Sequence, residues 1–371
     1  MKPADVGFAT AIASLPKVGP ARLRMLLDAG EPEGVWERLC CGTLGDDAEV
    51  VASLGPRADT LLAGWRGAAR TMDPGQLAVR HAALGFRLLD AEDPDYPSAF
   101  RDDAEPPRLL WVAGDLGRIL PRVVAIVGSR RCTRYGHDVA RRFGRELALA
   151  GVSVVSGLAL GIDAAAHAGA LDAPAGAAPP VGVVGTGLDV IYPRRNRALW
   201  QAVAERGVLL SESPPGASAE PWRFPARNRL IAALADIVVV VESTERGGSL
   251  YTVDEAMARD VEVRAVPGPI TAPTSAGTNR LLADGAAPAL NESDLLESLG
   301  VVAATPIGEY STGYRDPEEE AVLDVLTTGS VTFDELAERS GLSLERLGLV
   351  TARLQVEGLL SRSGGWYERA G

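Results

Sequence analysis

The chain has 371 residues, of which 46% are hydrophobic and 23% charged, and its formal net charge is −12. This length exceeds what one hydrophobic core usually covers, so we expect two or three domains, and the composition excludes a largely disordered protein. The negative charge excludes a protein that coats nucleic acid with its whole surface, because binding a polyanion requires positive potential.

The first domain is expected over residues 1–80 and to be helical. Its start lacks the basic residues and apolar core of a signal peptide, and no apolar run reaches the length of a membrane span. We therefore expect a cytoplasmic protein without membrane contact. The stretch ASLPKVGPARLRMLLDAG resembles a helix-hairpin-helix or SAM-like unit, with Lys17 where that motif usually has glycine. The surrounding acidic residues favour a helical bundle without DNA contact.

Residues 81–300 are predicted to form a Rossmann-like α/β domain. Apolar, β-branched runs recur every 26 to 29 residues, beginning near Val123, Val152, Val181, Val208, Ile237 and Val263. Helix-like stretches lie between the runs. One of them places Val139, Phe143 and Leu147 on one face and ends at Gly151. This alternation predicts a parallel sheet with helices on both faces.

Small and polar residues follow five of these runs. The turns are Gly128-Ser129-Arg130, Ser156-Gly157, Gly185-Thr186-Gly187, Ser211-Glu212 and Gly247-Gly248-Ser249. In an open parallel sheet such turns meet at the carboxyl edge, where helix N-termini attract anions. Glycine also makes tight turns without any ligand. Five such turns with Ser, Thr and Arg among them favour a phosphate-bearing ligand.

The usual phosphate-binding and catalytic motifs are absent. Val190 stands where a dinucleotide fingerprint needs its third glycine, and neither a Walker loop nor a nucleophile elbow occurs. The three cysteines give an odd count with two of them adjacent, which suits neither a disulfide framework nor a CxxC metal site. The three histidines are too few and too scattered for a zinc site. We expect Asp163 to cap a helix and His167 to be its interior partner. No cofactor, no metal and no catalytic residue is predicted.

The C-terminal part is expected to hold a linker, residues 301–315, and a winged-helix domain, residues 316–371. The domain shows three helical stretches and then a hairpin with glycine at its tip. From residue 316 onwards, 11 acidic residues stand against 5 arginines. Such a surface matches a phosphate backbone poorly, so protein contacts or a regulatory role are expected.

Six segments in one order carry a family resemblance over about half the chain. They are VAIVGSRRCTRYG, SGLALGIDAAAHAGAL, GTGLDVIYPRRN, FPARNRLIAALAD, RGGSLYTVDEA and AVPGPITAPTSAGTNRLLADGA. Together they resemble the DNA-processing protein A (DprA/Smf) family. The resemblance implies a protein that is not an enzyme. It implies one that binds single-stranded DNA, protects incoming strands during natural transformation, loads the RecA recombinase onto them and forms a homodimer.

The segment after Trp222 is predicted to bind the strand. Pro225 suits the first turn of a helix, so Arg223 and Phe224 are expected on the loop before it. Arg227 is expected on the helix, facing the sheet edge near Arg130. Arginine offers forked donors for phosphate oxygens, and an exposed aromatic ring offers a stacking plane for a base.

The resemblance implies DNA contacts from Arg130 and Phe224 and, in a Gly-Ser-x-x-Thr pattern, from Ser249 and Thr252. Some family members carry a lysine at the position of Pro221, for which Arg223 is the candidate replacement. The predicted DNA-binding residues are Gly128, Ser129, Arg130, Gly157, Arg223, Phe224, Arg227, Asn228, Arg229, Gly248, Ser249, Thr252 and Asn279.

Purely structural roles stay open for four of these residues. Phe224 can serve as a packing staple beside a helix start, and Asn228, Ser249 and Thr252 can serve in helix capping. An enzyme is the alternative function. RGGSLYTVDE is similar to the PGGxGTxxE motif of nucleotide phosphoribohydrolases of the lysine-decarboxylase-like group, with Glu255 near the place of the acid. Leu250 replaces a glycine of that motif, which disfavours the enzyme.

Overall fold

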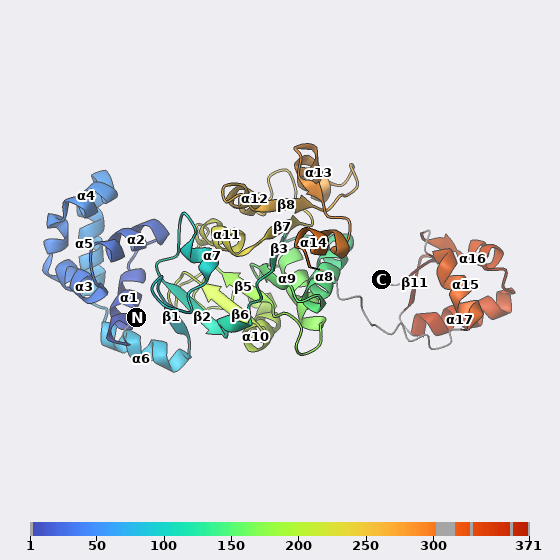
Figure 1. The fold of residues 1–371 in the computed structure, drawn as a ribbon, viewed down its shortest axis with the longest axis horizontal. Coiled ribbons are helices and arrows are strands. Elements are labelled where there is room, and N and C mark those ends of the chain that lie inside the picture. The colour runs from blue at the N-terminus through green and yellow to red at the C-terminus, as the bar shows by residue number, and fades with distance from the viewer. Residues whose placement is uncertain (1–2, 302–315, 327–328, 357–358, 370–371) are drawn as a thin grey trace. The chain divides into compact units, whose positions relative to one another are not determined.

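A computed structural model describes residues 3–301, 316–326, 329–356 and 359–369 of the chain (Figure 1). The chain divides into two compact units, Met1–Val302 and Ala303–Gly371. Nearly all of the linker expected at 301–315 lies outside the described residues. The domain boundary expected near residue 80 stays a prediction, because both sides of it belong to the first unit.

The first unit begins with helices, as predicted. They are α1 (Pro3–Ala13), α2 (Pro20–Asp28), α3 (Pro32–Cys41), α4 (Ala48–Leu54), α5 (Ala58–Ala69) and α6 (Pro74–Leu84). In the turn between α1 and α2, Lys17 has a φ of 62°, the left-handed conformation that glycine adopts most readily. The indole Nε1 of Trp65 donates to the carbonyl oxygen of Pro16 over 2.8 Å and so holds this turn against α5.

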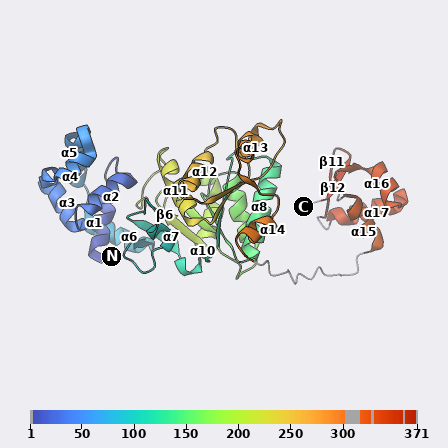
Figure 2. The same ribbon diagram turned by 45° about the horizontal axis from the view of Figure 1, so that its top comes forward.

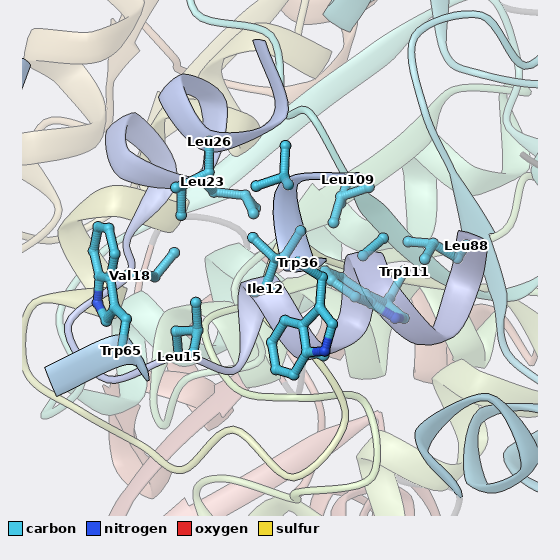
Figure 3. Close-up of a cluster of buried hydrophobic side chains, with 14 of the residues drawn as sticks. Ile12, Leu15, Val18, Leu23, Leu26, Trp36, Trp65, Leu88, Leu109 and Trp111 are labelled. Carbon is cyan, nitrogen blue, oxygen red and sulfur yellow. The ribbon is translucent and has the colours of Figure 1, made fainter. Parts of the chain in front are cut away.

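These helices share a hydrophobic core with the sheet domain (Figure 3). Ile12 and Trp36 from the helices lie in one buried cluster with Leu88 and Trp111 from the first two strands. Trp65 and Trp111 are fully buried. The N-terminal helices are therefore packed onto the sheet domain through continuous apolar contact.

The central sheet has nine strands in the order β1-β2-β6-β5-β4-β3-β7-β8-β9. The strands are β1 (Arg87–Leu89), β2 (Leu110–Gly114), β3 (Val123–Val127), β4 (Ser153–Ser156), β5 (Val181–Val184), β6 (Val208–Ser211), β7 (Ile237–Val240), β8 (Glu262–Ala265) and β9 (Ala287–Pro288). All six predicted strands are present as β3 to β8, and they pair in parallel. The antiparallel strands β1 and β2 extend the sheet beyond β6.

The helices of this domain are α7 (Ser98–Arg101), α8 (Arg134–Leu149), α9 (Ile162–Asp172), α10 (Arg197–Arg206), α11 (Arg223–Leu234), α12 (Leu250–Met257), α13 (Ala276–Ala283) and α14 (Glu292–Ser298). Figure 2 shows α11 beside α12, with α8 and α14 elsewhere on the sheet.

Alternate side chains of the central strands point to opposite faces, so each face has its own core. In β3, Val123 and Ala125 belong to one buried cluster with side chains of α11 and α12, including Leu230. Val124 and Ile126 belong to another cluster with side chains of α8 and α9. The predicted sheet with helices on both faces is confirmed. A strand that is buried on two sides requires apolar residues at every position, which explains the unbroken apolar run of β3.

The second unit is a winged-helix domain, as predicted. It contains α15 (Pro317–Val325), α16 (Phe333–Ser340) and α17 (Leu344–Val356), with a small antiparallel sheet of β10 (Val331–Thr332), β11 (Leu360–Ser363) and β12 (Trp366–Arg369). Gly364 and Gly365 both have positive φ in the turn between β11 and β12, as a tight hairpin turn of this kind needs.

Candidate functional site

A groove lies where the strand order of the sheet reverses. The chain runs from β3 through β4 and β5 to β6 in one direction, then returns to the other side of β3 with β7. Ligands of open α/β sheets bind at the carboxyl ends of the strands beside such a reversal. The loops after β3 and β7 and the first turns of α11 line a groove of about 830 Å³ there. The position agrees with the predicted carboxyl-edge site.

The loop after β3 is tied to the end of β7. The backbone N–H of Ser129 donates to the carbonyl oxygen of Glu242 over 2.7 Å. The buried carboxylate of Glu242 accepts the Thr133 N–H over 2.8 Å and the Thr133 hydroxyl over 2.5 Å. A Cβ on Gly128 would lie 2.7 Å from Ile162 Cγ1, which is too close for any larger residue. This loop therefore holds one conformation, with Arg130 at its exposed tip.

Three side chains form a layered wall of the groove. The guanidinium carbon of Arg130 lies 5.3 Å from the ring centroid of Phe224. The rings of Phe224 and Tyr192 have centroids 5.4 Å apart and planes 33° apart. Arg130 and Tyr192 are exposed and Phe224 is half-buried. The packing-staple role left open for Phe224 is not what the geometry shows, because its ring lines the groove against Tyr192.

Arg227 reaches the floor of the groove but is almost fully buried. Its Nη1 donates to the carbonyl oxygen of Gly157 over 2.8 Å and to that of Val183. The backbone N–H of Gly157 donates to the carboxylate of Asp163 over 3.1 Å. Burial lowers the pKa of Arg227 to about 10, with Asp163 opposing the shift. Arg227 is thus a cation at neutral pH that joins the ends of β4 and β5.

The opposite wall comes from the loop after β7 and the start of α12. Gly248, Ser249 and Thr252, three of the predicted DNA-binding residues, line the groove there. Ser249 is the N-cap residue of α12, but its hydroxyl donates to Ser243 Oγ over 3.0 Å and makes no capping bond to the helix. The position expected for a cap is therefore present without the side-chain bond, and the contact of Ser249 with phosphate stays a prediction.

The prediction that placed Arg223 and Phe224 on a loop was wrong. Helix α11 begins at Arg223, and Pro225 stands at its third position. Proline is tolerated there because the first-turn N–H groups have no partner within the helix. Asn228 lies inside α11 and lines the groove, so it is no helix cap.

Gly157 is not part of the groove lining but lines a smaller pocket with Arg130 and Phe224. Three further predicted residues lie away from the groove. Arg223 donates through Nη1 to Ser213 Oγ over 2.9 Å and lies 3.4 Å from the Glu220 carboxylate. Arg229 is buried and pairs with Glu212. It lies two positions after Arg227, so helix geometry turns it to a different face.

The third of these residues is Asn279, on α13. Its amide Nδ2 donates to the carbonyl oxygen of Gly268 over 2.9 Å, and its Oδ1 accepts the Gly268 N–H. Both ends of the amide are occupied by one neighbouring loop. The side chain therefore fixes the segment after β8.

The sequence interpretation missed three groove residues, Tyr192, Tyr251 and Arg131. Tyr192 and Tyr251 are 41% and 57% exposed, which leaves ring surface open to a ligand. Tyr192 could have been found from its position in the segment after β5, because the turn that begins this segment was predicted to lie at the carboxyl edge. Tyr251 follows the Gly-Gly-Ser turn directly.

Asp163 and His167 lie on α9, and Asp163 lines the groove. Asp163 was expected to cap this helix, but the N-cap is Gly161 and Asp163 is the second helical residue. Burial raises the pKa of Asp163, while Arg227 acts against this shift. His167 is fully buried, as expected of an interior partner, and burial lowers its pKa to about 4. It is therefore neutral at pH 7.

Within the described ranges, no cluster of three or more His, Cys, Asp or Glu side chains could hold a metal ion. No helix in the same ranges combines the length and apolar character that crossing a bilayer requires.

Comparison with known proteins assigns the chain to a family. Residues 87–300 match the family model of DNA recombination-mediator protein A, and residues 310–365 match the DprA winged helix domain. The putative DNA processing protein DprA of Mycobacterium tuberculosis (strain ATCC 25618 / H37Rv) is 38% identical over 323 residues, which cover 80% of each chain. Protein Smf of Escherichia coli (strain K12) is 33% identical over 290 residues, 76% of this chain and 77% of the relative.

Solved structures agree with this assignment. DNA processing protein A from Streptococcus pneumoniae is similar with a TM-score of 0.63 and 30% identity, over 80% of this chain and 98% of that one. The Helicobacter pylori protein, described for its single-stranded DNA binding mode, is similar with a TM-score of 0.52 and 32% identity, over 58% and 95% of the two chains. The chain described here belongs to the DNA recombination-mediator protein A (DprA/Smf) family of DNA-processing proteins.

Proposed function

We propose that the chain binds single-stranded DNA in the groove at the carboxyl edge of the sheet. The observation that carries this proposal is the layered wall of Arg130, Phe224 and Tyr192. An exposed guanidinium suits a phosphate, and aromatic rings suit unpaired bases, whose faces are available only in a single strand. The single-stranded DNA binding mode of the Helicobacter pylori relative supports the same assignment.

The test is binding of a labelled poly-dT oligonucleotide beside a duplex of the same length, at two salt concentrations. The single strand is expected to bind more tightly, because base stacking in a duplex hides the faces that Phe224 and Tyr192 would contact. Equal affinity for both forms, or no binding of either, would contradict the proposal.

Neutralising Arg130 tests the phosphate contact. Arg130→Ala is expected to weaken single-strand binding and to lower the slope of log affinity against log salt by about 0.7, the value for one phosphate of a single strand. Arg130→Lys should keep the slope, because it keeps the charge. Arg118→Ala, which removes an exposed charge next to β2, is the matched control. An unchanged affinity and slope for Arg130→Ala would remove the phosphate site from the proposal.

The same proposal includes RecA loading by a homodimer during natural transformation. Its support is membership of the DprA family. Loading requires this protein to hold a single strand and the recombinase together. We expect the protein to sediment as a dimer and to accelerate RecA filament formation on single strands. A monomer at every working concentration, combined with normal RecA stimulation, would count against the dimer.

The phosphoribohydrolase alternative is less well supported by the geometry. That enzyme would need Glu255 beside its ligand, but Glu255 pairs with Arg259 over 2.5 Å and is no part of the groove lining. Release of free base from a nucleoside monophosphate would nevertheless restore the alternative.

A further inference from the structure

A second hollow, of about 600 Å³, lies where the N-terminal helices meet the segment before α11. Its lining includes Lys17, Pro20, Arg22, Arg57, Leu61 and Trp222. Pro221 lines the groove at the carboxyl edge, and its chain neighbours Glu220 and Trp222 line the hollow. The groove and the hollow therefore adjoin at Pro221, whose side chain is exposed.

Trp222 offers an open ring at this junction. Its side chain is 39% exposed. The indole Nε1 donates to the Glu220 carboxylate over 2.8 Å, and the guanidinium carbon of Arg223 lies 4.5 Å from the ring centroid. A Cβ on Gly19 would lie 3.2 Å from Trp222 Cζ3, so the ring also packs against the turn before α2. The indole is thus held by its neighbours without being covered by them.

Positive charge gathers around this ring. Lys17 and Arg57 are exposed and Arg22 is half-buried. None of these three cations forms an ion pair within the described part of the chain. Glu220 is the one acidic residue in the described lining, and it is already engaged by Trp222 and Arg223. The hollow therefore carries an excess of positive charge, although the whole chain carries −12.

The turn that carries Lys17 is fixed by the helices around it. Val18 is buried in the same apolar cluster as Trp65 (Figure 3). The Trp65 N–H is bonded to the carbonyl oxygen of Pro16, and Arg22 Nη1 donates to the carbonyl oxygen of Lys17 over 2.6 Å. The cations thus stand on a preformed turn, so a ligand that binds them orders little backbone.

We propose that this hollow is a second contact for the same single strand, in which a base stacks on Trp222 and Lys17, Arg22 and Arg57 hold the neighbouring phosphates. The inference rests on the single-strand binding proposed above. An exposed ring among cations is the combination that binds unpaired nucleotides, and a strand that leaves the groove over Pro221 meets Trp222 next.

The sequence had favoured N-terminal helices without DNA contact, because acidic residues surround the turn. The described helices α1 to α6 contribute no acidic residue to the lining of the hollow. The charge that a strand would meet there is therefore not the average charge of this region.

Oligonucleotide length separates the hollow from the groove. Sites for single strands usually span about 4–16 nucleotides, so an oligo-dT of about 6 nucleotides would fill the groove and one of about 20 would also reach the hollow. The variants are W222A and K17G/R57A. Glycine suits the φ of 62° at position 17, so this substitution adds no backbone strain. The matched control is R70A/R118A, which removes two exposed arginines that do not line the hollow.

With the longer oligonucleotide, W222A is expected to bind about 5- to 150-fold more weakly, the equivalent of one lost base stack, with an unchanged salt slope. K17G/R57A should lower the slope of log affinity against log salt by about 1.4, at 0.7 for each of two phosphates. Both variants should bind the shorter oligonucleotide like the wild type, and R70A/R118A should match the wild type at both lengths.

Tryptophan fluorescence reports the stack directly, because a stacked base quenches indole emission. Of the six tryptophans, only Trp222 and Trp366 have exposed side chains. In the W366F variant, the longer oligonucleotide should therefore quench the emission of Trp222, and the shorter one should leave it nearly unchanged. W222F/W366F should bind the longer oligonucleotide without this quenching.

Each other result overturns the inference in a distinct way. Wild-type behaviour of W222A and K17G/R57A at both lengths would leave the groove intact and assign the hollow to a protein partner. An equal loss at both lengths would place Trp222 in the groove and not beyond it. If W222A melts early, the fluorescence of W366F decides alone, and absence of quenching by the longer oligonucleotide would remove the stack. Failure of the wild type to bind either oligonucleotide would refute the proposed function, and this contact with it.

Discussion

Phe224→Ala is expected to weaken binding of a single-stranded oligonucleotide by about 1–3 kcal/mol, the range for losing one base–aromatic stack. The slope of log affinity against log salt should stay at its wild-type value, because stacking releases no counterions. The result would be a parallel shift of the salt titration. Arg130→Ala, in contrast, should change the slope.

The control for this variant is Phe224→Tyr, which keeps a ring between Arg130 and Tyr192 and should bind nearly as well as the wild type. Thermal melts of both variants exclude unfolding. If Phe224→Ala melts at a much lower temperature and yet binds DNA normally once folded, Phe224 supports the fold and stacks no base.

Arg229→Ala is expected to lower the free energy of unfolding by about 3–5 kcal/mol, the usual cost of removing one partner of a buried ion pair. The side chains of Arg229 and Glu212 are only 5% and 11% exposed. Burial raises the pKa of Glu212, and Arg229 is the main group that opposes the shift. Without Arg229, the Glu212 carboxylate must stay buried without its partner or take up a proton. Urea denaturation measures the loss.

A double variant, R229M/E212L, should recover much of this stability, because replacing both members of a buried pair by apolar residues is often neutral. Arg131→Ala, which removes an exposed arginine, should unfold like the wild type. DNA affinity separates the roles: the folded Arg229→Ala protein should bind normally. A normal unfolding free energy together with lost affinity would show that Arg229 contacts the strand after all.

The sheet could be predicted from the sequence because burial on both faces demands long apolar runs. Val123 to Val127 is such a run. A polar side chain at any of its positions would bury a charge or a hydrogen-bonding group without a partner. The antiparallel strands β1 and β2 were not predicted. They are short, and the loop that contains α7 separates them in the sequence. No period of two or of 3.6 therefore stands out in this segment.

The location of the candidate site was predictable, but not every residue that lines it. The turns after β3 and β7 indicated the edge, since topology brings those turns together whatever their sequence. The three arginines of α11 could not be sorted in the same way. Whether an arginine can reach a ligand depends on partners from distant strands. Arg227 is held by the carbonyl oxygens of Gly157 and Val183. Arg229 is held by the carboxylate of Glu212.

The shared core of the N-terminal helices and the sheet has a consequence for cooperativity. Trp36 and Trp65 lie in the same apolar cluster as Trp111 of β2. If the helices detached, the β2 side of that cluster would be exposed to water at a cost of about 25 cal/mol for each Å² of apolar surface. The helices and the sheet should therefore melt in a single calorimetric transition. A fragment that ends near residue 80 would lack part of its own interior.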